Sequence, residues 1–200
     1  MIRIRSELIL LAAAACAGEP SSPAGGEPAS VDAVPDWAAN VAHDRLDAKQ
    51  LRDLATLAMV TAPFHRDTVA ARAGWSAIIT GCMSHPTEGA MGMHQGNPTY
   101  IGDGKVAVDR PELLVYEPDR NGRNRLVAVE YIVPFTDWKS PNPPRLFGRN
   151  FAENKVFGIW ALHVWLWKAN PSGLFADWNP RVTCRHAPPA MAGAPSHGAH

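Results

Sequence analysis

Apolar residues in the first third of the chain recur at intervals of three and four, which is the period of an amphipathic helix. They lie between Asp36 and Thr61 and comprise Leu46, Leu51, Leu54, Leu57, Ala58 and Val60. Asp44 or Asp47 would cap the start of this helix. A proline at position 63 interrupts the pattern before Phe64 to Trp75 resumes it. The pattern therefore predicts two helices, or one kinked helix, ending near residue 74.

Beyond Gly81 the helical period is lost, and short segments rich in Val, Ile, Leu, Tyr and Trp predict strands. These segments are Glu112 to Glu117, Arg125 to Pro134 and Gly158 to Lys168. An Asn-Gly pair at 121–122 predicts a hairpin between the first two. Loops rich in Pro and Gly are expected over Ser84 to Arg110 and Thr136 to Arg149. We therefore expect one α+β domain over residues 36–186, with N-terminal helices followed by a mostly antiparallel sheet.

The ends of the chain have a different character. Residues 1–15 combine early arginines with a short apolar stretch, as in a bacterial export signal. The stretch is too short to span a bilayer, and the Ala-Ala-Cys that ends it resembles a lipoprotein signal with Cys16 as the lipidated residue. An ordinary signal cleaved before this cysteine is the alternative. Residues 16–35 are expected to form a flexible tether and residues 187–200 a disordered tail.

Charge and composition narrow the choice of partners. The 200 residues carry 19 Lys plus Arg against 19 Asp plus Glu, and 46% of them are hydrophobic. A chain of this size and composition builds a core, which excludes disorder throughout. Because the net charge is zero, no basic field attracts nucleic acid. We expect localisation in the periplasm or cell envelope, membrane contact through the lipid anchor only, and a small molecule as a possible ligand.

Three cysteines are present, and export determines how they are interpreted. With Cys16 assigned to the signal, Cys82 and Cys184 are the pair that remains, and an oxidising compartment favours a disulfide between them. In the alternative interpretation Cys82 is a reduced thiol, acting as a nucleophile or soft metal ligand close to His85.

The candidate chemistry lies in polar residues placed on apolar strands. The chain has no His-Glu-x-x-His, phosphate-binding glycine loop, Gly-x-Ser-x-Gly or Cys-x-x-Cys motif. Strand alternation places Glu130 among apolar neighbours, and it places His163 on one face with Trp165 and Trp167. An ionised carboxylate in such surroundings is costly unless it is paired or bound to a metal. Glu130 and His163 are therefore expected to meet over one face of the sheet.

Two further histidines complete a possible metal site. His65 stands at the start of the second expected helix, and His94 lies in a segment rich in Gly and Met. His65, His94, Glu130 and His163 would form a ligand set suited to Zn, Fe, Mn, Ni or Cu. If the protein is an enzyme, Glu130 would serve as a ligand or as a general base. In the alternative interpretation each of these residues is simply hydrogen-bonded in the core.

Tryptophans provide a second candidate site. Trp165, Trp167 and Trp178 would form a platform on which a glycan or another planar small molecule stacks, with polar contacts from Asp177 and Asn179. The protein would then be a non-enzymatic envelope protein. Core packing of these rings is the alternative, and a purely structural lipoprotein is the third interpretation.

Several segments together resemble a family of uncharacterised exported bacterial proteins. They are Gly-Ala-Met-Gly-Met-His at 89–94, Val-Glu-Tyr at 129–131, His-Val-Trp-Leu-Trp at 163–167, and Asn179-Pro180 followed by Cys184. The likeness covers about Phe64 to Cys184. It implies an exported location and similar domain limits, agrees with a bridge between Cys82 and Cys184, and implies no particular reaction.

Overall fold

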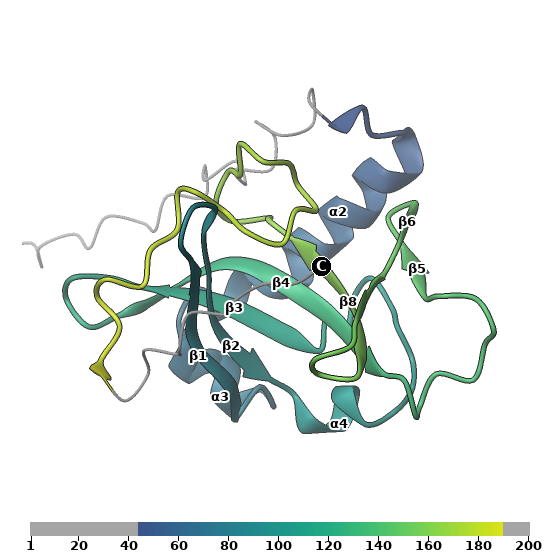
Figure 1. The fold of residues 1–200 in the computed structure, drawn as a ribbon, viewed down its shortest axis with the longest axis horizontal. Coiled ribbons are helices and arrows are strands. Elements are labelled where there is room, and N and C mark those ends of the chain that lie inside the picture. Colours follow the sequence, from purple (N-terminus) through teal and green to yellow (C-terminus); the bar gives the residue numbers. More distant parts are fainter. Residues whose placement is uncertain (1–43, 190–200) are drawn as a thin grey trace, which may run out of the picture. The chain divides into compact units, whose positions relative to one another are not determined.

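A computed structural model describes residues 44–189 of the chain (Figure 1). Within this range six antiparallel strands form one curled sheet in the order β1-β2-β3-β4-β8-β7. The strands are β1 (Ala77–His85), β2 (Gly89–Gly96), β3 (Leu113–Pro118), β4 (Asn124–Pro134), β7 (Ala152–Asn154) and β8 (Ile159–Val164). The short strands β5 (Arg145–Leu146) and β6 (Arg149–Asn150) pair with each other.

Helices precede and interrupt the sheet. They are α2 (Ala48–Thr61), the 3-10 turn η1 (Ala62–Phe64), α3 (Asp67–Arg72) and α4 (Pro98–Ile101). Asp47 starts α2 with a capping box, since its carboxylate accepts the Gln50 N–H and the Gln50 side chain accepts the Asp47 N–H. Residues 36–43 of the expected helix lie outside the described range. None of the helices within residues 44–189 has both the length and the apolar character needed to cross a membrane.

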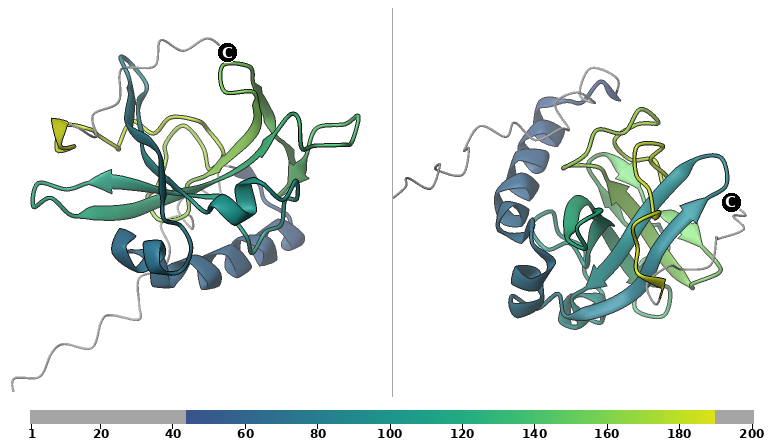
Figure 2. Two further views of the ribbon diagram at one scale, coloured as in Figure 1. Left: turned by 90° about the horizontal axis from the view of Figure 1, so that it is seen from below. Right: turned by 90° about the vertical axis from the view of Figure 1, so that its left-hand side faces the viewer.

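The two faces of the sheet are covered differently. Helices α2 and α3 lie on one side of the sheet in both views of Figure 2. The main core includes Leu54, Leu57, Leu114, Tyr116, Val129, Tyr131, Leu162 and Leu166. A smaller cluster comprises Ala90, Val115, Val127, Ala128, Trp165 and Val182, the last two of which belong to the C-terminal segment 165–184. Sheet and helices together make the described residues an α+β fold.

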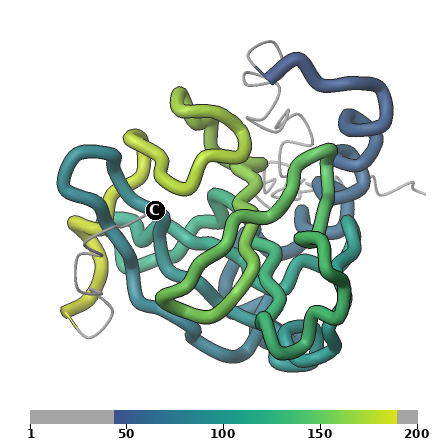
Figure 3. Tube along the Cα trace, turned by 45° about the vertical axis from the view of Figure 1, so that its right-hand side comes forward, coloured from purple at the N-terminus to yellow at the C-terminus, as the bar shows by residue number. Residues whose placement is uncertain are grey.

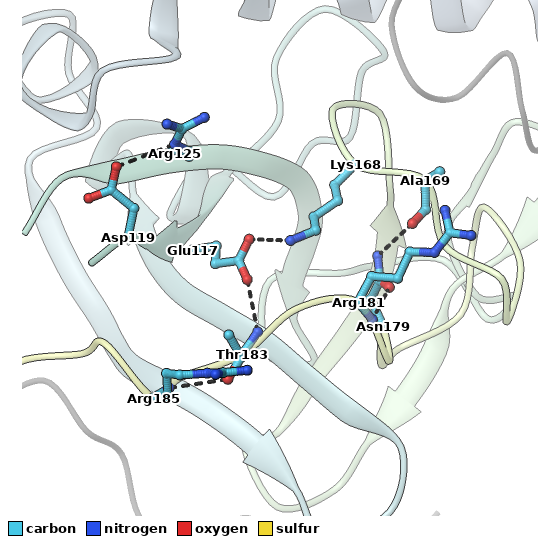
Figure 4. Close-up of polar contacts among 9 residues, drawn as sticks. All are labelled: Glu117, Asp119, Arg125, Lys168, Ala169, Asn179, Arg181, Thr183 and Arg185. Carbon is cyan, nitrogen blue, oxygen red and sulfur yellow. Dashed lines mark hydrogen bonds and ion pairs between the residues drawn. The ribbon is translucent and has the colours of Figure 1, made fainter. Parts of the chain in front are cut away.

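The C-terminal segment is tied to the sheet at several points. It runs next to the turn between β1 and β2 (Figure 3), where Asn179 forms an isolated antiparallel bridge with Ala90. The carboxylate of Glu117 on β3 pairs with Lys168 and accepts the Thr183 N–H at 2.9 Å (Figure 4). The expected disulfide between Cys82 and Cys184 is confirmed, with a Cα–Cα distance of 5.6 Å.

Two expectations about strands need correction. The segment expected as a loop from Ser84 contains β2, which pairs with β1 along its length and with β3. Its Gly and Ala residues have little strand propensity, so it is the pairing with neighbouring strands that makes it extended. In addition, β8 ends at Val164 rather than at Lys168, because the Trp165 N–H donates to the Leu174 carbonyl at 2.9 Å instead of to β4. The Trp167 N–H still donates to the Val127 carbonyl of β4 at 3.0 Å.

Candidate metal centre

Three strands position the candidate site. His94 lies on β2, Glu130 on β4 and His163 on β8. Glu130 and His163 are direct register partners, which confirms the prediction that they meet over one face of the sheet. His94 is opposite Val115 on β3, and β3 in turn pairs with β4. Because register partners in antiparallel strands point to the same face, the three side chains meet across the intervening β3.

The distances between the ligand atoms suit a transition metal. His94 Nε2 lies 3.3 Å from Glu130 Oε2 and 3.4 Å from His163 Nε2. Each residue offers one ligand atom, and all three atoms lie within 4.8 Å of one another. Ligands bound tetrahedrally at 2.0–2.1 Å lie about 3.3–3.4 Å from one another. Two sides of the group therefore already have the spacing that a bound ion requires.

The group is buried, and burial sets its protonation. His94 is 2% exposed, His163 3% and Glu130 7%. Burial, followed by the neighbouring His163, lowers the pKa of His94 to about 3, so its imidazole is neutral at neutral pH. Burial raises the pKa of Glu130, although His163 opposes this shift. Burial alone would lower the pKa of His163, but Glu130 and then Asp177 outweigh it and raise that pKa.

Two residues that were not assigned to the metal site contact its imidazoles. Thr80 Oγ1 lies 2.7 Å from His94 Nδ1, and Asp177 Oδ1 lies 3.8 Å from His163 Nδ1. Thr80 belongs to β1 and is the register partner of His94, a pairing that the sequence does not reveal because the β-branched residues 78–80 of β1 show no alternation that would set a register. Asp177 was expected only as a polar contact of the tryptophan platform. Its role next to His163 depends on how the C-terminal segment folds back.

The fourth expected ligand, His65, does not belong to this group. It follows η1 and is exposed, with its ring packed edge-on against Trp167 at 4.4 Å between centroids. Trp167 itself turns toward the helices, where its indole N–H donates to Thr61 Oγ1 at 3.1 Å. The expected common face of His163 and Trp167 ends where β8 ends, so His65 and Trp167 meet each other instead of the metal-binding group.

The tryptophans do not form an exposed platform. Trp165 is fully buried, Trp178 is 8% exposed and Trp167 is half-buried. The Trp165 indole donates to the Ala176 carbonyl at 2.6 Å, and its ring stacks on His163 with centroids 6.2 Å apart. Trp165 thus forms part of the enclosure of the His/Glu group. Likewise, the thiol interpretation of Cys82 is replaced by the disulfide.

The fold and the site together define an α+β domain with a buried His/Glu/His group that could hold a metal ion. No family model matches the chain, and no curated protein or solved structure matches it either. The likeness to exported bacterial proteins stays a prediction.

Proposed function

We propose that the protein binds a divalent transition-metal ion through His94, Glu130 and His163. The observation that supports this most directly is the spacing of His94 Nε2, which lies 3.3 Å from Glu130 Oε2 and 3.4 Å from His163 Nε2 in a buried setting. Two imidazoles and one carboxylate are a donor set used for Zn²⁺ and for non-haem Fe²⁺. Three protein ligands leave at least one coordination position for water or a small ligand.

A bound metal would also offset the free-energy penalty of burying the Glu130 carboxylate. Glu130 is buried, and its raised pKa reflects the penalty for a charge in apolar surroundings. A divalent cation would offset this penalty more completely than one imidazole can. The neutral His94 has a lone pair available for coordination without first losing a proton.

Elemental analysis of the full-length protein, purified without a histidine tag, tests the proposal. We expect one metal ion per chain, and we expect Glu130→Gln and His163→Gln to lose it while keeping their circular dichroism spectra. His65→Gln is the matched control, since His65 lies outside the group and its loss should leave the stoichiometry unchanged. A metal content far below one per chain would show that the group of His94, Glu130 and His163 holds no metal. A metal content that both buried substitutions leave unchanged would show the same.

We further propose that the protein is exported and anchored by a lipid on Cys16. The bridge between Cys82 and Cys184 supports export, because disulfides persist in oxidising compartments. The signal features at residues 1–15 and Cys16 itself lie outside the described residues. Mass spectrometry of the mature N-terminus in a bacterial host tests this, with a diacylglyceryl group expected on Cys16. An unmodified Ala17 or Cys16 at the mature N-terminus would exclude the anchor.

A further inference from the structure

The two imidazoles of the candidate metal centre approach each other through the same ring nitrogen, although their planes are inclined by 75°. Their Nε2 atoms face each other at 3.4 Å, so each Nδ1 lies on the side of its ring away from the other imidazole. For His94 this outer atom lies 2.7 Å from Thr80 Oγ1, which is hydrogen-bond distance. Coordination through Nε2 requires the proton of a neutral imidazole to sit on Nδ1. Thr80 Oγ1 can accept a hydrogen bond from this Nδ1–H.

The outer nitrogen of His163 has a different environment. His163 Nδ1 is buried and has no hydrogen-bond partner within residues 44–189. Two carboxylate oxygens lie just beyond hydrogen-bond distance: Glu130 Oε1 at 3.7 Å and Asp177 Oδ1 at 3.8 Å. A buried N–H without an acceptor is destabilising, so one of these oxygens is expected to approach when the proton occupies Nδ1.

We propose that Asp177 is the positioning residue of the centre, accepting a hydrogen bond from His163 Nδ1–H while Nε2 holds the metal. This inference rests on the proposed metal site. Glu130 is fixed in the middle of β4 and commits Oε2 to the ion, which leaves it little room to turn. Asp177 lies outside the sheet with a side chain 39% exposed, and a shift of about 1 Å brings it within hydrogen-bond distance.

The backbone around Asp177 is held so that only its side chain needs to move. The carbonyl before it, Ala176 O, accepts the Trp165 indole N–H at 2.6 Å. The carbonyl after it, Trp178 O, accepts a hydrogen bond from Asn170 Nδ2 at 2.9 Å. Asp177 is thus presented to His163 by a segment pinned on both sides, and its exposure connects the buried centre to solvent. Carboxylate–histidine–metal arrangements of this kind orient the ring and make it a better ligand.

Metal affinity of the full-length protein tests the proposal. We would measure Zn²⁺ affinity by competition with a chromophoric chelator and record Co²⁺ absorption spectra for the parent, Asp177→Ala and Asp177→Asn. Asp177→Ala should weaken Zn²⁺ binding by about 10- to 100-fold and alter the Co²⁺ bands. Asp177→Asn keeps an acceptor oxygen without the charge and should restore part of the affinity. Glu153→Ala on β7 is the control for lost negative charge and should bind within about twofold of the parent.

The outcomes separate this inference from the proposed function. A parent protein that binds neither ion would refute the metal site itself. A parent that binds Zn²⁺ with an Asp177→Ala variant of equal affinity would refute only the role of Asp177. An equal loss in Glu153→Ala would assign the effect to net charge. A loss of affinity that Asp177→Asn does not reduce, together with a lower melting temperature of the metal-free variants, would show that the substitutions disturb the structure. Each of these results would overturn the inference.

Discussion

Two glutamates are buried within residues 44–189, and their surroundings differ. Glu130 lies between two imidazoles, which gives its charge a partner and places its oxygens where they could hold a metal ion. Glu112 is 1% exposed, and its Oε2 accepts the Ile132 N–H at 3.1 Å. Burial raises the pKa of Glu112 to about 8, so this carboxyl group is largely protonated in the folded protein at neutral pH. A buried carboxyl group thus serves structure at one position and candidate chemistry at the other.

Glu112 makes folding stability depend on pH. Because its pKa is about 8 in the folded protein against an ordinary 4.5, folding takes up a proton between these values. The free energy of unfolding should therefore fall as pH rises from about 5 to 8, by at most roughly 1.4 kcal/mol per pH unit from this group. Glu112→Gln keeps the acceptor for the Ile132 N–H and should remove this slope.

Urea unfolding of the parent and Glu112→Gln at pH 5 and pH 8.5 measures the difference. The variant should match the parent at pH 5 and be the more stable protein at pH 8.5. A variant that is less stable than the parent at both values would mean that Glu112 is ionised in the folded state and is stabilised by that charge.

At the scale of elements, the strands of the site differ in how far the sequence predicts them. Alternation of apolar residues predicts β4 and the start of β8, and their pairing brings Glu130 and His163 together. The hairpin of β1 and β2 has no such pattern, so neither the position of His94 nor its contact with Thr80 follows from local sequence. Strands of this kind cannot be predicted from local sequence, because pairing with strands distant in the sequence determines their conformation.

The turn of that hairpin depends on Gly89. Its φ is +98°, and a Cβ there would lie 2.2 Å from the Asn179 carbonyl oxygen. Both the backbone conformation and the contact with the C-terminal segment therefore require glycine. Gly89→Ala should lower the free energy of unfolding by about 2–3 kcal/mol or more, because backbone strain and a steric clash add. It should also weaken metal binding, since the Ala90–Asn179 bridge holds the segment that carries Asp177.

Gly158 supplies the matched control. Its φ is +67°, but a Cβ there meets nothing within 4 Å. Gly158→Ala should therefore cost only the backbone term of about 1 kcal/mol and leave metal affinity unchanged. Equal losses in the two variants, measured by urea unfolding, would mean that the C-terminal segment does not press against the hairpin turn in solution.

At the scale of the whole molecule, the C-terminal segment contacts residues that are far from it in the sequence. It covers the smaller apolar cluster with Trp165 and Val182, presents Asp177 to His163, and ends at the disulfide. Cys184 and its partner are predictable because they are the only pair left once Cys16 is assigned. The path between Trp165 and Cys184 is not, since it follows single contacts such as that between Thr183 and Glu117 rather than a repeating pattern. The position of His65 likewise depends on a single contact, that with Trp167, so the sequence wrongly predicts it in the metal-binding group.

The disulfide should stabilise both the fold and the centre. It joins residues 102 positions apart, so removing it releases chain entropy in the unfolded state worth about 4–5 kcal/mol. Cys82→Ser combined with Cys184→Ser should lower the melting temperature strongly. It should also weaken Zn²⁺ binding, because the segment that carries Asp177 would lose its attachment at one end. Metal added to the double variant should recover part of the stability, by about 2.7 kcal/mol at a free concentration 100 times its dissociation constant.

Calorimetry with and without Zn²⁺ separates these effects. Val156→Ser is the control, since that side chain is 80% exposed and its loss should change neither the melting temperature nor the affinity. If the disulfide acted only on the unfolded chain, the double variant would melt earlier but bind Zn²⁺ as tightly as the parent. A joint loss of stability and affinity, by contrast, requires that the bridge also orders the segment beside His163. Equal melting temperatures in the parent and the double variant would contradict the presence of the bridge in solution.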